Sequence, residues 1–388
     1  MIKSISGKKE FFMKKIISVF ITGMLVCGAV NAQSIKVTNT FGGDSDSTGG
    51  SDLFIFENQK DDDGSYKNEF GNKTRVSNRL QLDASNERFD SRLRMEIGTT
   101  KLNGKESTIR FRGYGRFKPV EQFQLIAGND FFTKVTVDAG YLAASDDNPK
   151  YARILQNGFG VISNWKFGDE KNVSLKIAGG FKGTDDSFLD TKNLGLDSGL
   201  NFGMKDLFSA GATFQNVTGD TPTVGAFAGL NAVENLILNV GYIYNDTDTD
   251  YIPAASKNVV SFTAGYKFSE LGLSLAGDVI SALGNEYLDD GETKKYEKNN
   301  KDLIPFLTKV NVSYNATEDI TIGVKAKLSC MIGDNDSVQT ELYPNVTYKM
   351  PNKIGSLTTG VRINIDNDGL SKIAVPLSWK CTLAEIKN

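Results

Sequence analysis

Histidine is absent from this sequence, and the absence removes several classes of protein. Enzymes that use an imidazole as general base or nucleophile partner are excluded, and so are metal centres built from Cys and His. Hydrolysis by a pair of carboxylates stays formally open, but no such pair stands out. We therefore expect no enzyme activity, no metal site and no cofactor.

Cysteine is also scarce, with Cys27, Cys330 and Cys381 as the three examples in 388 residues. Three cysteines are too few for a disulfide scaffold. After residue 32, no stretch approaches 18 consecutive apolar residues, so no transmembrane helix is predicted. The chain lacks a basic excess, with 44 Lys and Arg against 47 Asp and Glu, which disfavours nucleic acid as a partner.

The first 32 residues have the layout of a secretory signal peptide. Lys14 and Lys15 precede an apolar run at 16–30, and Val30-Asn31-Ala32 places small residues before a cleavage point. Met13 is an alternative start, because "MKK" opens a conventional leader. Residues 33–388 would then form the mature chain, with a net charge of −7.

Most of the remaining sequence alternates with a period of two. In the stretch "RFDSRLRMEI" (88–97), charged side chains occupy all five even positions. The same alternation recurs in many segments, up to the last one at 371–383. This period indicates strands with two different faces, because a helix would repeat every 3.6 residues.

The connections between these segments alternate in length. Short turns such as 118–122, 231–235 and 315–319 are separated by long polar connections such as 131–157 and 284–302. Tight turns at one end and long loops at the other are typical of a transmembrane β-barrel. Aromatic residues gather where strands meet the short turns, as an interfacial girdle would: Phe117, Trp165, Tyr266, Phe268, Tyr314 and Tyr348.

The pattern therefore predicts an all-β protein, a transmembrane antiparallel up-and-down β-barrel of about 16–18 strands. The barrel is expected over 52–388, and 33–51 is either a strand or a flexible segment. In the last segments no charge falls on the outward parity, where Lys or Arg near the bilayer midplane would cost about 2–4 kcal/mol.

Arginine is concentrated in one region. Eight of the ten arginines lie between residues 75 and 116, and alternation predicts all eight on one face of three consecutive strands: Arg75, Arg79, Arg88, Arg92, Arg94, Arg110, Arg112 and Arg116. With Lys118, and against Asp83, Asp90 and Glu96, this face has a net charge of +6. Such a face needs water, so we expect it to line a lumen and set the field there. In the alternative interpretation, these arginines are solvated residues that only keep the lumen filled with water. Further basic residues share the inward parity on later strands, among them Lys309, Lys325 and Lys327.

In these features the chain resembles the general porins of the Gram-negative outer membrane, over nearly the whole mature chain. The resemblance implies a basic ladder facing an acidic third external loop that folds inward. Here that loop is 131–157, with Asp138, Asp146 and Asp147 as its pore-lining acids. It also implies contact with outer-membrane lipid, and it leaves monomer and homotrimer open.

The function expected from the sequence is passive diffusion of small hydrophilic solutes or ions across the outer membrane, with a modest preference for anions. One alternative is a surface adhesin or ligand-binding protein anchored by its barrel. A second alternative is a barrel transporter for hydrophobic substrates, which the charged lumen disfavours.

Overall fold

The structure is a computed structural model of the whole chain. It describes residues 33–41, 51–60, 66–70, 76–99, 107–128, 133–134, 153–154, 158–168, 170–182, 195–218, 222–230, 232–246, 256–284 and 303–387. The predicted signal peptide at 1–32, most of 131–157, Arg75, Asp138, Asp146 and Asp147 lie outside these ranges.

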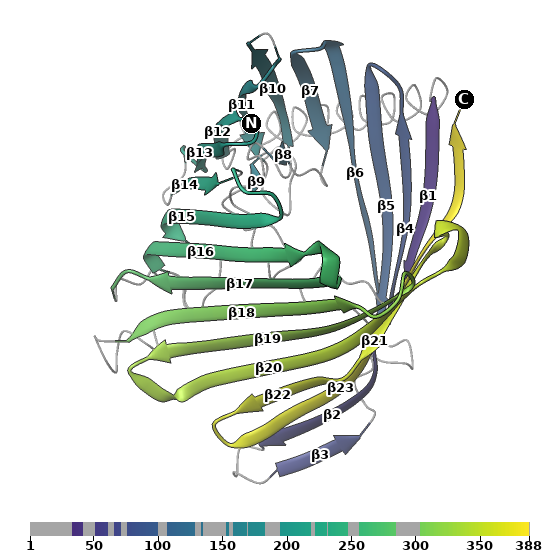
Figure 1. Ribbon diagram of the computed structural model, residues 1–388, viewed down its shortest axis with the longest axis vertical. Coiled ribbons are helices and arrows are strands. Elements are labelled where there is room, and N and C mark those ends of the chain that lie inside the picture. Colours follow the sequence, from purple (N-terminus) through teal and green to yellow (C-terminus); the bar gives the residue numbers. More distant parts are fainter. Residues whose placement is uncertain are drawn as a thin grey trace, which may run out of the picture.

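Antiparallel strands make up almost all of the described structure (Figure 1). Their bounds are β1 Ser34–Phe41, β2 Ser51–Lys60, β3 Tyr66–Phe70, β4 Val76–Ser85, β5 Phe89–Thr99, β6 Ser107–Val120, β7 Phe123–Gly128, β8 Thr133–Lys134, β9 Arg153–Ile154, β10 Gly158–Phe167, β11 Val173–Lys182, β12 Gly195–Met204, β13 Phe208–Gln215, β14 Thr223–Leu230, β15 Leu236–Asp246, β16 Ser256–Phe268, β17 Leu273–Ala282, β18 Ile304–Asn315, β19 Ile320–Ile332, β20 Asp334–Lys349, β21 Gly355–Gly360, β22 Arg362–Asp366 and β23 Gly369–Lys387.

The strands form one closed up-and-down barrel of 18 strands, which confirms the predicted fold class. β1 and β2 lie end to end along β23, and β3 and β4 lie end to end along them. β21 and β22 together fill the place between β20 and β23. Each of these three composites counts as one strand of the ring.

The first and last strands close the barrel directly. Ser34 pairs with Lys387 and Phe41 pairs with Trp379, while the other edge of β1 pairs with β4. A closed ring leaves no free sheet edge along this seam, which satisfies the backbone hydrogen bonds that lipid cannot. Within 33–51, the segment whose structure the sequence left open, residues 34–41 are therefore part of the wall.

The two faces of the wall differ as alternation predicts. On β19, Ile322 and Val324 are exposed on the outer face, whereas Lys325 and Lys327 alternate with them and are half-buried. On β5, Leu93 and Ile97 are exposed outward, between positions that carry charge. Exposed apolar side chains on a membrane barrel contact lipid, so the charged positions face the lumen.

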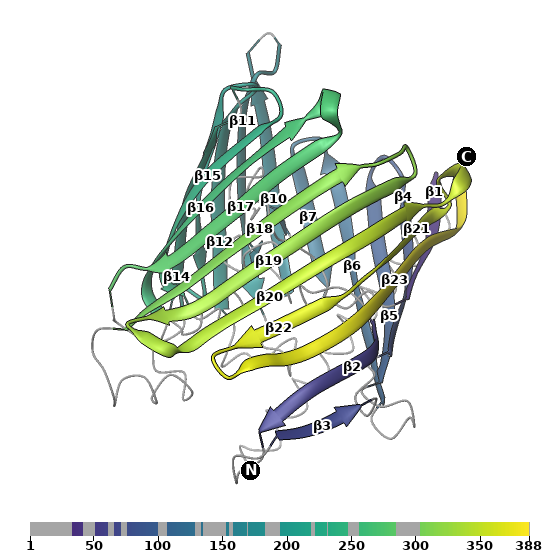
Figure 2. The same ribbon diagram turned by 60° about the horizontal axis from the view of Figure 1, so that its bottom comes forward.

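The two ends of the barrel also differ (Figure 2). Short turns join strands at one end, where the C-terminal end of β23 also lies. Two of these turns are single 3₁₀ turns, Ser269–Leu271 and Pro351–Lys353. The first ends at Gly272, whose φ of 62° a residue with a side chain rarely adopts.

Aromatic pairs ring the short-turn end, where the sequence predicts a girdle. Four pairs have ring centroids 4.7–5.9 Å apart: Phe89–Phe117, Phe123–Trp165, Phe202–Phe208 and Tyr266–Phe268. Aromatic rings favour the level of lipid headgroups, so this band marks one membrane interface.

Candidate functional site: the charged lumen wall

The inward face of β4–β6 carries a row of charged side chains, which we call the arginine wall. Its members are Arg79, Gln81, Asp83, Asp90, Arg92, Arg94, Glu96, Arg112, Tyr114, Arg116 and Lys118. Strand register brings them together, because residues directly opposite on neighbouring strands share a face. Gln81 lies opposite Arg94, which lies opposite Arg112, and Asp83 lies opposite Arg92.

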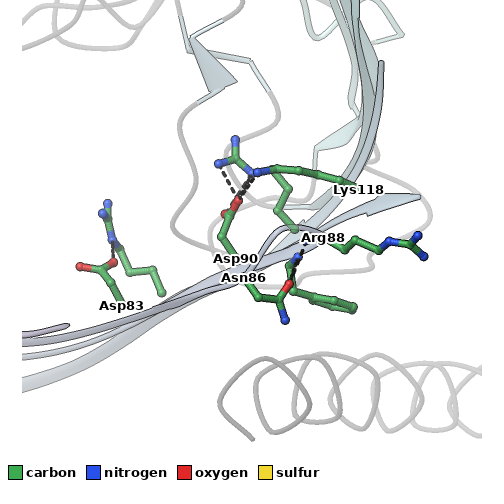
Figure 3. A network of polar contacts seen from close by, with 8 residues as sticks. Asp83, Asn86, Arg88, Asp90 and Lys118 are labelled. Atoms are coloured by element: carbon green, nitrogen blue, oxygen red, sulfur yellow. Dashed lines mark hydrogen bonds and ion pairs between the residues drawn. The ribbon is translucent and has the colours of Figure 1, made fainter. Parts of the chain in front are cut away.

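Three short ion pairs hold the arginine wall. Nε of Arg79 is 2.7 Å from Oε1 of Glu96, and Nε of Arg92 is 2.7 Å from Oδ1 of Asp83. Near the short turns, Asp90 accepts from Arg116 at 2.8 Å and lies 3.3 Å from Nζ of Lys118 (Figure 3). Partly buried ion pairs with this geometry fix the positions of the side chains. The planar guanidinium group of Arg forms such pairs better than the flexible ammonium group of Lys.

The wall keeps a positive excess after these pairs form. Its described side chains include six cations and three carboxylates, so its net charge is +3. The carboxylate of Glu96 contacts two cations, because its Oε1 pairs with Arg79 and its Oε2 is 3.8 Å from Nε of Arg112. Three of the cations that the sequence assigns to this face are not among these side chains.

Those three are Arg75, Arg88 and Arg110. Arg75 lies outside the described residues. Arg110 lies opposite Glu96 in the backbone register, and the structure describes no more of it. Arg88 is not on a strand, because β5 begins at Phe89.

The turn between β4 and β5 explains the position of Arg88. The carboxamide oxygen of Asn86 accepts the backbone N–H groups of Arg88 and Phe89, at 2.9 and 2.7 Å. This side-chain turn ends the alternation before Arg88. The Arg88 side chain is exposed and extends away from Asp90 (Figure 3).

A second charged row lies on β17–β23, and we call it the lysine wall: Asp278, Lys309, Lys325, Lys327, Glu341, Arg362 and Lys372. Asp278 lies opposite Lys309, and Lys327 lies opposite both Lys309 and Glu341. With five cations and two carboxylates its net charge is also +3. β1 lies between β23, the last strand of this wall, and β4, the first strand of the arginine wall.

Neighbouring side chains contact Asp278 and Arg362 of the lysine wall. The hydroxyl of Thr263 donates to buried Asp278 at 2.9 Å. Nε of Arg362 is 3.8 Å from Oε1 of Glu341, and its guanidinium lies 5.5 Å from the Tyr343 ring centroid. The cation–ring contact and the carboxylate both favour a fixed arginine at this position.

A third part of the ring, β10–β14, has an inner face rich in glycine, which we call the glycine wall: Gly158, Gly160, Gly180, Gly195, Gly199, Gly203, Gly211, Gly225 and Gly229. Sequence reasoning missed this feature, although the glycines are two residues apart in the segment "GFG" and four apart in "GLDSGLNFG", and both spacings keep them on one face of a strand. Without side chains, this face lets another backbone approach closely.

Inward side chains on and beside the glycine wall are buried. Ile162, Val259 and Leu307 are 0–1% exposed, and so are the polar side chains of Asp197, Asn201 and Thr213. On the arginine wall, by contrast, the paired side chains keep contact with solvent. Water therefore reaches the arginine wall, whereas Asp278, Lys309 and Arg362 of the lysine wall are buried like the inner residues of the glycine wall.

The short pair β8–β9 lies in the connection between β7 and β10. Thr133 pairs with Ile154 and Lys134 with Arg153. β9 contacts β12 and β13, although β7 and β10 are themselves neighbours in the ring. In Figure 1 both short strands lie within the outline of the ring.

Other kinds of site do not emerge from the described ranges. They contain no group of three or more metal-ligating side chains. No helix among them has the length and apolar character to span a membrane. Cys330 and Cys381 are free thiols on strands that are not neighbours.

The fold and the charged lumen define the class as a porin-like β-barrel. Solved structures agree with the fold. Pseudomonas aeruginosa OccK5 (OpdH) is 11% identical with a TM-score of 0.53, covering 90% of this chain and 98% of that one. Acinetobacter baumannii OccAB4 is 10% identical with a TM-score of 0.52, covering 92% and 99%. The outer membrane protein opdK of Pseudomonas aeruginosa is 11% identical with a TM-score of 0.50, covering 92% and 99%. No family model and no curated protein sequence matches the chain.

Proposed function

We propose that the protein is an outer-membrane channel that passes small hydrophilic solutes by diffusion, with a modest preference for anions. The observation that carries the proposal is the pair of basic walls on one arc of the lumen, each with a net charge of +3. A permeating ion responds to the charges it passes, because low-dielectric barrel walls focus the field along the pore.

We infer that the pore follows this charged arc. The glycine wall offers room for an inserted segment, and β9 contacts β12 and β13 there. The buried Oδ1 of Asn201 has no hydrogen-bond donor among the described residues, and a buried acceptor without a donor costs about 1–3 kcal/mol. A segment from 131–157 covering β12 and β13 would supply such a donor and narrow the lumen from that side.

The buried inner residues also bear on the transporter alternative. Ile162, Val259 and Leu307 are apolar and face inward, but they are closed to solvent. A route for hydrophobic substrates needs accessible apolar surface, so these residues favour packing against protein over contact with a solute.

Planar bilayer recording tests the channel proposal against the adhesin alternative. Purified folded protein should give stepwise increases in conductance, and the same preparation after boiling should give none. A folded barrel that inserts without conductance steps would refute the channel proposal and leave the barrel as an anchor.

A further inference from the structure

A row of inward-facing residues crosses the strands that join the lysine wall to β1 (Figure 2). Lys349 on β20 lies opposite Ser356 on β21. Ser356 lies opposite Lys380 on β23, which in turn lies opposite Thr40 on β1. Trp379, the residue before Lys380, is exposed on the lipid face. Because neighbouring residues of a strand point to opposite faces, Lys380 and the residues opposite it face the lumen.

Lys380 differs from the other lysine of this row in its contacts. The ammonium group of Lys349 donates to the backbone oxygen of Glu318 at 3.3 Å. The side chain of Lys380 is exposed and forms no ion pair with any of the described residues. Its ammonium group, which carries three donors and no acceptor, is therefore available to an acidic group of a solute.

Three hydroxyl groups surround this ammonium group. Ser356 and Thr40 lie on the two neighbouring strands, at the ordinary strand spacing of about 4.8 Å, and Ser378 lies two residues before the lysine on the same face. All three are half-buried, and none has a side-chain hydrogen bond among the described residues. In the next row, by contrast, the hydroxyls of Thr347 and Thr358 bond to each other at 2.9 Å.

We propose that Lys380, Ser356, Thr40 and Ser378 form a specificity site that favours carboxylates bearing hydroxyl groups. A hydroxyl group both donates and accepts, so hydroxyls on the carbons next to a carboxylate can bond to the serine and threonine hydroxyls while the carboxylate contacts the ammonium group. A carboxylate without hydroxyls gains only the charge interaction, which every cation of the lumen offers.

The inference rests on the proposed channel, because a solute must enter the lumen to reach the row. It concerns the choice among anions of equal charge, which a general field cannot make. A field acts on charge alone, whereas hydrogen bonds depend on the groups that the solute carries.

Reversal potentials in planar bilayers test the choice with glycerate and propionate, each measured against chloride at pH 8. The two anions have the same carbon chain and one carboxylate, and glycerate carries two additional hydroxyl groups. A pore that sorts by size alone would favour propionate, because it is the smaller anion. The wild type should instead be more permeable to glycerate, roughly two- to tenfold, as expected for a gain of one net hydrogen bond.

Ser356→Ala combined with Thr40→Val should abolish this preference. Ser313→Ala combined with Ser329→Ala is the matched control, because it also removes two inward hydroxyls. Those two serines lie opposite uncharged residues, namely Ser274 and Gly323 for Ser313, and Leu307 and Gln339 for Ser329. The control variant should keep the preference for glycerate.

A wild type that conducts KCl but favours propionate, or an equal loss of preference in the two double variants, would overturn the site and leave the proposed channel standing. A folded wild type that inserts and gives no conductance in KCl would refute the proposed function, and the specificity site with it.

Discussion

Placing one arginine on either face of β19 tests the assignment of lipid and lumen. Val324 is 38% exposed on the outer face, between Pro344 on β20 and Val312 on β18. Lys325 is the next residue and faces inward, so Lys325→Arg keeps its charge in water. Arginine on the lipid face of a barrel costs about 2–4 kcal/mol near the midplane. Val324→Arg should therefore destabilise the barrel by about that amount, and Lys325→Arg should change its stability little.

A loss of 2 kcal/mol shifts an unfolding equilibrium roughly 30-fold, because each 1.4 kcal/mol is a factor of ten. Reversible unfolding by denaturant in lipid vesicles, followed by the fluorescence of Trp165 and Trp379, measures the difference. Equal stability of the two variants, or a larger loss for Lys325→Arg, would refute the assignment of the faces.

Three further results are expected. Unboiled protein in detergent should migrate differently from boiled protein on a gel, because a closed barrel has no free edge from which to unzip; equal migration together with a helical circular dichroism spectrum would contradict the fold. Glu96→Gln should increase the anion preference by raising the arginine wall from +3 to +4, whereas Glu121→Gln, in an exposed turn, should not; a decrease in bilayer selectivity would show that Glu96 does not act through lumen charge. N-terminal sequencing of the membrane-extracted protein should begin at Gln33, and an intact leader would refute the predicted cleavage.

Alternation predicted the fold well because a membrane barrel repeats one physical constraint on every strand. Residues such as Val324 and Lys325 must face lipid and water in turn, so period two remains visible through the whole chain. The composite strands could not be predicted in this way. β1 and β2 share one edge of β23 although residues 42–50 lie between them, and no local pattern shows that two separate segments extend one strand.

The shared face of the arginines was predictable for a related reason. Parity alone placed Arg92, Arg94 and Arg112 on one face, because it depends only on spacing along each strand. It failed at Arg88, where Asn86 forms a side-chain turn before the strand starts. The pairing of Arg94 with Arg112 depends on register between strands, which the spacing within one strand does not contain.

The zero-current potential across a bilayer under a KCl gradient tests the central claim most directly. Wild-type protein should be modestly anion-selective, and a variant with Arg79, Arg92, Arg94 and Arg112 changed to Gln should lose most of that preference. Changing Arg88, Lys171 and Lys205 to Gln, all exposed in short turns, should have a small effect, because charges there are screened within about 10 Å at 0.1 M salt. A cation-selective wild type, or a quadruple variant with unchanged selectivity, would contradict the role assigned to the arginine wall.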